Sequence, residues 1–221
     1  MAGARRNPTA ASLTVADPFA ALVRAALAIP ASLTNAEIER CRIYVDILLL
    51  WSSRLSLTAA KSAESIILEH LLDSLYIVPL LDRGFCVADI GSGAGFPGIP
   101  LAIVCPDVNF ILLEPRRKRA NFLREVTRQT NLQNVEVLEQ RAEKLDVDRC
   151  FDLIVARAVG TVGNLLSLSA PLIKPGGRLI CMKGPMGRNE LAAYPAFGEP
   201  EITEYRLPNG AVHLLMIQRR L

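Results

Sequence analysis

The chain has 221 residues, of which 51% are hydrophobic and 21% are charged, a composition typical of folded soluble domains and unlike disordered or fibrous proteins. Its formal net charge of +3 permits a polyanionic partner but is smaller than the surplus of a dedicated nucleic-acid-binding domain. The five cysteines are scattered, with no Cys-x-x-Cys pair, and the longest apolar run, residues 47–51, is too short to cross a bilayer. We therefore expect a cytoplasmic protein with no disulfide framework, no metal site and no membrane segment.

The first 82 residues show helical patterns. Pro18, at a first helical position, opens a helix that should run toward Ile29. Thr34 and Glu37 have the spacing of a capping box at the start of a second helix, and a third is expected over 62–81. The chain is thus expected to divide into three parts: a disordered tail (1–15), a helical segment (16–82) and a main domain (83–221).

Beyond residue 82, short apolar runs alternate with helical patterns, which predicts a mostly parallel sheet covered on both faces. The expected strands cover residues 85–90, 108–113, 135–139, 151–156, 178–183, 201–207 and 211–218, and the expected helices cover 98–104, 117–131 and 162–173. Asn209-Gly210 between the last two strands is a strong hairpin signal, so the last strand should run antiparallel. A mostly parallel seven-stranded sheet with an antiparallel last strand is the Rossmann-like α/β architecture of class I methyltransferases.

A glycine-rich turn joins the first expected strand to its helix. Gly91, Gly93 and Gly95 allow the backbone to turn sharply and to approach a ligand without a Cβ in the way. Glu114 closes the second strand, where a carboxylate can accept the protons of ribose hydroxyls. Asp89, just before the turn, would repel a pyrophosphate but suits the sulfonium and amino group of S-adenosylmethionine. We therefore expect all five residues to bind S-adenosylmethionine.

Two further groups of residues have competing interpretations. Arg117, Arg124 and Arg128 share one face of a basic helix, which is either solvated or contacts RNA phosphates. His70 and Asp73 could suggest acid–base chemistry, but they are remote in sequence from the glycine turn. A packing or orienting hydrogen bond is the favoured interpretation of that pair.

Several longer strings occur in a fixed order along the chain: WSSRLSLT (51–58), HLLDSL (70–75), DIGSGAGFPGIPL (89–101), LLEPRRKR (112–119), RAE (141–143), ARAV (156–159) and KG (183–184). Through these strings the chain resembles the bacterial small-subunit ribosomal RNA guanine-N7 methyltransferase G family, also named glucose-inhibited division protein B. The Phe-Pro-Gly extension of the glycine turn is the most specific piece. Pro115 and Gly160 are mild departures from the family pattern.

The resemblance implies the site, the substrate and the partner. It adds cofactor contacts at Gly91, Phe96, Ala142, Glu143 and Arg157. Arg157 and Lys183 are our candidate catalytic residues, expected to guide the base or a phosphate. The implied substrate is N7 of a guanine in 16S ribosomal RNA of the small subunit, and we expect the enzyme to act as a monomer without a metal. Methylation of N7 needs no general base, because this nitrogen carries a lone pair and no proton.

Three other functions are compatible with parts of the sequence. A methyltransferase of a small molecule would need the same cofactor turn, and the basic helix argues only weakly against it. A nicotinamide oxidoreductase is disfavoured by the spacing of the glycines. A non-enzymatic RNA-binding factor that keeps the fold as a scaffold is disfavoured by the intact Gly91, Gly93, Gly95 and Glu114.

Overall fold

The computed structural model describes residues 33–146, 150–191 and 193–221, together with Phe19, Ala20 and Leu22. The expected tail at 1–15 and most of the helix expected toward Ile29 lie outside these residues. The expected seven-stranded sheet is confirmed, with the strand order β3-β2-β1-β4-β5-β7-β6. Its strands are β1 (Cys86–Ile90), β2 (Asn109–Leu113), β3 (Val135–Leu138), β4 (Phe151–Arg157), β5 (Ile173–Lys183), β6 (Glu201–Arg206) and β7 (Val212–Arg219).

The helices lie close to where the sequence places them. They are α2 (Asn35–Ser52), α3 (Ala63–Ile66), α4 (Leu72–Leu75), α5 (Gly98–Val104), α6 (Arg117–Gln129) and α7 (Val162–Ser169). A π-helical turn, η1 (Ile67–Leu71), joins α3 to α4, so the single helix expected over 62–81 is interrupted. Short 3-10 turns follow at η2 (Val78–Leu80), η3 (Ala142–Lys144) and η4 (Pro185–Glu190).

The order of the strands reverses between β1 and β4. From β1 the chain moves outward through β2 to β3, and it then returns to place β4 on the other side of β1. The five strands β1 to β5 are parallel, while β7 pairs antiparallel with both β5 and β6, which confirms the expected antiparallel last strand. In an open α/β sheet, ligands bind outside the carboxyl ends of the strands at such a reversal. This sheet therefore opens a binding crevice after Ile90 and Arg157.

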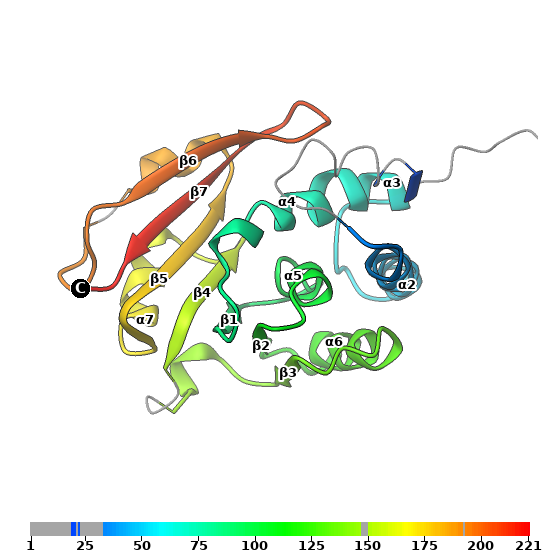
Figure 1. Cartoon of the computed structure of the whole chain (residues 1–221), viewed down its shortest axis with the longest axis horizontal. Helices are drawn as coiled ribbons and strands as arrows, with labels where there is room; N and C mark the ends of the chain where they lie inside the picture. Colours follow the sequence, from blue (N-terminus) through cyan, green and yellow to red (C-terminus); the bar gives the residue numbers. More distant parts are fainter. Residues whose placement is uncertain (1–18, 21, 23–32, 147–149, 192) are drawn as a thin grey trace, which may run out of the picture.

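Alternating side chains bury the two faces of the sheet in separate cores. On β1, Val87 belongs to the core beneath α5 and α6, whereas Ala88 belongs to the core that includes Leu165 and Leu166 of α7. Figure 1 shows α2, α5 and α6 on one face of the sheet and α7 on the other. The central strands β1, β2 and β4 are buried on both faces, which explains their almost continuously apolar sequences.

The helical segment packs directly on the main domain. Thr34 and Glu37 form the expected capping box at the start of α2, with the Thr34 amide donating to the Glu37 carboxylate at 2.6 Å. From α2, Val45 and Leu48 are fully buried in the same core as Leu112 of β2. The expected helical segment and the main domain therefore share one hydrophobic core. No helix among the described residues is both long and apolar enough to span a membrane.

Truncation of Leu48 should test this shared core. Leu48 is fully buried, so we expect Leu48→Ala to lower the free energy of unfolding by about 2–5 kcal/mol through lost contacts and the cavity left behind. Leu50→Ala is the matched control, because Leu50 lies on the same helix and is 69% exposed. Its effect should stay within about 0.5 kcal/mol. Equal effects of the two variants in urea denaturation would contradict the burial of α2 in the main core.

Candidate functional site

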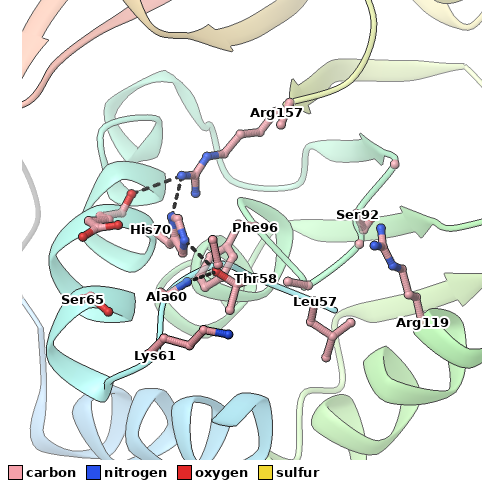
Figure 2. A pocket seen from close by; sticks show the side chains of 16 residues that line it. Leu57, Thr58, Ala60, Lys61, Ser65, His70, Ser92, Phe96, Arg119 and Arg157 are labelled. Atoms are coloured by element: carbon pink, nitrogen blue, oxygen red, sulfur yellow. Dashed lines mark hydrogen bonds between the residues drawn. The ribbon is translucent and has the colours of Figure 1, made fainter. Parts of the chain in front are cut away.

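A cavity of about 560 Å³ lies at the carboxyl ends of β1 and β4, where the strand order reverses (Figure 2). This volume is in the range of small-molecule and cofactor sites. Its wall combines the glycine turn, the end of β4, the start of α6 and the helical segment. The lining residues are Leu57, Thr58, Ala59, Ala60, Lys61, Ser65, Glu69, His70, Gly91, Ser92, Gly93, Ala94, Phe96, Arg119, Arg157 and Ala158.

The glycine turn requires glycine at Gly91 and Gly95, for the same two reasons at each position. Gly91 has φ +72°, and a Cβ there would lie 2.6 Å from a methyl carbon of Val159. Gly95 has φ +98°, and a Cβ there would lie 2.8 Å from a side-chain carbon of Ile99 and 3.0 Å from the hydroxyl of Tyr44. Other residues rarely adopt these dihedral angles, and neither position has room for a side chain. Without side chains at these two positions, the backbone of the turn can pack closely against Val159, Ile99 and Tyr44 while it borders the cavity.

Glu114 anchors the turn from below. Only 3% of Glu114 is exposed, and its Oε2 accepts a hydrogen bond from the Gly93 amide at 3.0 Å. Its other oxygen, Oε1, accepts from the Arg116 amide at 2.8 Å and so also fastens the entry to α6. One carboxylate thus ties the glycine turn to the next helix. The expected contact of Glu114 with a ribose stays a prediction, because Glu114 is not among the residues that line the cavity.

Asp89 is fully buried beneath the turn and does not line the cavity. Its Oδ2 accepts a hydrogen bond from the Gly98 amide at 3.1 Å, at the first residue of α5, while Oδ1 has no hydrogen-bond partner among the described residues. Burial raises the pKa of Asp89 to about 7, and the Gly98 amide opposes this rise. The contact that the structure gives Asp89 is with the protein backbone, and the expected contact with the cofactor stays a prediction.

Arg157 projects from the end of β4 into the wall of the cavity. Its Nε lies 3.2 Å from Oδ2 of Asp73, and its Nη2 donates to the Glu69 carbonyl at 3.1 Å and to Nδ1 of His70 at 2.7 Å. The guanidinium carbon also lies 5.7 Å from the centre of the Phe96 ring, within the range of a cation–π contact. Figure 2 shows Arg157 directed toward His70, with Phe96 beside the histidine ring.

The structure brings only some of the predicted site residues to the cavity. Gly91, Gly93, Phe96 and Arg157 line it, whereas the others do not: Asp89, Gly95, Glu114, Ala142, Glu143 and Lys183. Lys183 donates to the Gly160 carbonyl at 2.8 Å and to the Glu190 carboxylate at 2.7 Å. Lys183 therefore joins the end of β5 to Gly160 and Glu190 and does not line the cavity, and its expected role in guiding the substrate stays a prediction.

Residues of the helical segment form much of the wall, and sequence reasoning assigned none of them to the site. Thr58, Lys61, Glu69 and His70 all line the cavity. His70 lies within the π-helical turn, a distortion that frequently occurs at functional sites. The His70–Asp73 pair was judged too remote in sequence, but folding places both residues against Arg157. The strings at 51–58 and 70–75 were the signal that could have identified Thr58, His70 and Asp73.

The three arginines predicted to contact RNA have different surroundings. Arg124 contacts the Glu139 carboxylate at 3.2 Å, and Arg128 contacts Glu125 at 2.8 Å. Arg117, in the first turn of α6, is exposed, as are Arg116 and Lys118 beside it. Among the described residues, the cations of α6 that face no carboxylate therefore lie at its first turn. This turn is next to Arg119, which lines the cavity. Contact of these arginines with RNA stays a prediction.

Within the described parts of the chain, no group of three or more His, Cys, Asp or Glu residues is arranged to hold a metal ion. The charged and titratable side chains that line the cavity are those of Lys61, Glu69, His70, Arg119 and Arg157.

Comparison with known proteins adds a family to this geometry. A family model described as rRNA small subunit methyltransferase G matches residues 37–199. A protein of Xanthomonas oryzae pv. oryzae named ribosomal RNA small subunit methyltransferase G is 37% identical over 179 residues, which cover 80% of this chain and 84% of that protein. A protein of the same name from Stenotrophomonas maltophilia is 39% identical over 177 residues, covering 79% and 83%.

Two solved structures with similar folds carry methyltransferase names. A tRNA (m1A58) methyltransferase from Aquifex aeolicus superposes with a TM-score of 0.56 at 18% identity, covering 67% of this chain and 68% of that one. A putative O-methyltransferase from Klebsiella pneumoniae gives a TM-score of 0.57 at 18% identity, covering 80% and 89%. These likenesses establish the fold, a class I methyltransferase sheet.

The raised pKa of Asp89 predicts a specific dependence of stability on pH. Between the ordinary pKa of 3.8 and the folded value of about 7, the folded protein binds a proton that the unfolded chain has released. Stability should therefore fall as pH rises through this window. Asp89→Asn cannot titrate, so the melting temperature of the wild type relative to this variant should decrease from about pH 4 to about pH 8. A difference that does not change with pH would show that Asp89 is not held protonated by burial.

Proposed function

Because this chain belongs to the rRNA small subunit methyltransferase G family, we propose that it transfers a methyl group from S-adenosylmethionine to N7 of a guanine in 16S ribosomal RNA. The observation that carries the proposal is the position of the cavity. It lies at the reversal of strand order, and the glycine turn after β1 forms its wall.

The residues around the cavity fit S-adenosylmethionine. Gly91 and Gly93 line the cavity with backbone in the left-handed region and carry no Cβ, so a ligand can approach the main chain closely. Phe96 offers an apolar ring edge beside the turn, and the residue is only 8% exposed. When bound, S-adenosylmethionine supplies a methyl group on a positively charged sulfur. The cofactor would be held by the four predicted residues that line the cavity: Gly91, Gly93, Phe96 and Arg157. The proposal also includes cofactor contacts with four residues that do not line the cavity: Asp89, Glu114, Ala142 and Glu143.

The chain's own residues act by positioning. Guanine N7 carries a lone pair, so no side chain has to remove a proton, and correct placement of the two reactants can supply most of the acceleration. Arg157 is fixed by three polar contacts and faces the cavity, so it can orient an acceptor group of either reactant. Phe96 lines the cavity and packs on the buried ring of Tyr44, with ring centres 5.4 Å apart, so an apolar contact supports this wall of the site.

The substrate strand would approach over the basic rim of the cavity. Lys61 and Arg119 line the opening, and Arg116, Arg117 and Lys118 are exposed at the first turn of α6 beside it. Phosphate contacts from such cations position RNA, while a base that is methylated within a cavity has to be unpaired or splayed out. We place Arg117 in this contact, with Arg124 and Arg128 at most at its margin because each already faces a carboxylate.

The modification itself provides the test of this function. Deleting the gene should remove one 7-methylguanosine from 16S ribosomal RNA, as measured by mass spectrometry of nuclease fragments. The wild-type gene should restore it, and Gly93→Leu should not, because the new side chain would project from the wall of the cavity.

Gly84→Leu is the matched control for Gly93→Leu. Gly84 has φ +82° against +55° for Gly93, so both substitutions strain the backbone, but Gly84 has no atom within 4 Å of an added Cβ and does not line the cavity. The Gly84→Leu gene should restore the modification. An unchanged 16S modification pattern after deletion would refute the ribosomal substrate and leave methylation of a small molecule as the better hypothesis.

A further inference from the structure

A buried polar chain connects the terminal hairpin to the cavity. It begins at Asp73 of α4, which is only 1% exposed and whose carboxylate faces three side chains. Oδ1 accepts from the hydroxyl of Tyr205 in β6 at 2.6 Å and pairs with Nδ1 of His213 in β7 at 2.8 Å, while Oδ2 lies 3.2 Å from Nε of Arg157. A buried carboxylate is costly unless it is paired and hydrogen-bonded. Tyr205 and His213 supply the hydrogen bonds at Oδ1, whereas Oδ2 accepts none among the described residues and is paired with Arg157 by charge.

The directions of the hydrogen bonds fix the tautomers of both histidines. A guanidinium can only donate, so Nδ1 of His70, 2.7 Å from Nη2 of Arg157, must be an acceptor. The proton of His70 is therefore on Nε2, which lies 2.9 Å from the hydroxyl oxygen of Thr58. A carboxylate can only accept, so His213 must carry its proton on Nδ1, opposite Asp73. Burial and the charge of Arg157 lower the pKa of His70, which favours its neutral ring.

The chain ends on a hydroxyl that faces the cavity. The oxygen of Thr58 accepts from Nε2 of His70 and from the Ala60 amide at 3.1 Å, so both of its acceptor positions are used. Its proton is then available to donate, and Thr58 lines the cavity beside Arg157. Figure 2 shows this sequence of side chains, from Arg157 through His70 to Thr58.

We propose that Asp73 is a positioning residue for methyl transfer, which holds Arg157 and, through the tautomer of His70, sets the Thr58 hydroxyl as a donor into the cavity. The proposal rests on the function proposed above, in which both reactants meet in this cavity. The wall formed by Thr58 and Arg157 presents donors, so it recognises an acceptor oxygen. Two sources share that chemistry: the carboxylate of S-adenosylmethionine and the O6 carbonyl that lies beside N7 of guanine.

The terminal hairpin thereby becomes part of the site without lining it. Tyr205 and His213 both bind the Asp73 oxygen that does not face Arg157, and they leave Oδ2 for the guanidinium. Tyr76 stacks on Tyr205 with ring centres 4.1 Å apart, but its hydroxyl donates to the Arg206 carbonyl and does not touch Asp73. Of these two tyrosines, only Tyr205 therefore donates a hydrogen bond to the Asp73 carboxylate.

Nitrogen-15 NMR of labelled histidine tests the proposal without requiring a ribosomal substrate. The chain has 2 histidines, so the spectrum contains two rings, and His213→Gln assigns them. We expect His70 as the Nε2–H tautomer and His213 as the Nδ1–H tautomer in the wild type. In Asp73→Asn, His70 should populate both tautomers. A wild-type His70 protonated on Nδ1, or a tautomer unchanged in Asp73→Asn, would overturn the proposal.

Kinetics on small ribosomal subunits provide the second readout. Asp73→Asn should lower kcat by about 10²-fold, the loss expected when a reacting group is displaced by about 1 Å. Tyr205→Phe should reduce kcat by a smaller factor, and Tyr76→Phe, the matched control, should leave it unchanged. If Asp73→Asn lost activity only in proportion to its loss of folded protein in thermal melting, Asp73 would be a structural residue and the proposal would be wrong.

Thr58→Val separates the two sources of the acceptor oxygen. Weaker binding of S-adenosylhomocysteine in calorimetry would assign the oxygen to the cofactor carboxylate. Unchanged binding with a reduced kcat would assign it to the guanine carbonyl. Either result supports the proposal, and wild-type values of both quantities would overturn it. If the wild type itself did not methylate ribosomal particles while the histidine tautomers were as expected, the proposed function would fail and the positioning role of Asp73 would remain.

Discussion

The site depends on how the backbone turns after β1. The amides of Gly91 and Ser92 donate to the Leu113 carbonyl at 2.9 and 3.1 Å, and the next amide, that of Gly93, donates to Glu114. Three successive donors are thereby tied to the end of the neighbouring strand β2. This arrangement fixes the turn at the point where the strand order reverses, so that the backbone itself becomes the wall of the cavity. A longer side chain at Gly91 would displace the end of β4 through Val159.

The helical segment forms the wall of the cavity that the sheet does not provide. A Rossmann-like sheet alone provides the turn and Arg157, but the opposite wall comes from residues 57–70. These residues are held in place because α2 and the helices after it share the core of α5 and α6. The Tyr44 hydroxyl also donates to the Ala94 carbonyl at 2.7 Å, which joins α2 directly to the glycine turn. The contacts that stabilise the helical segment therefore also determine the shape of the cavity.

Local patterns predicted the fold well, and they predicted the site in part. Strand alternation, the capping box at Thr34 and the glycine turn depend on neighbouring residues, so the sequence indicates them directly. The contacts of Arg157 with Glu69 and His70 span 88 and 87 residues, a separation at which no local pattern carries information. Lys183 shows the same limit: it is the last residue of β5, and only the folded structure reveals that its amine donates to Glu190, so its expected role stays a prediction. The positions of Asp89 and Glu114 in the sequence predicted cofactor contacts that stay predictions, while their backbone contacts emerged only from the folded structure.

The central claim is that one cavity, between the glycine turn and the helical segment, holds the methyl donor beside Arg157. The most direct measurement is a crystal structure of the protein with S-adenosylhomocysteine, the demethylated product. We expect the ligand in the cavity, in contact with Gly91, Gly93 and Phe96, with Arg157 still paired to Asp73. A ligand bound elsewhere, for example in the groove beside Trp51 and Arg54, would contradict the account.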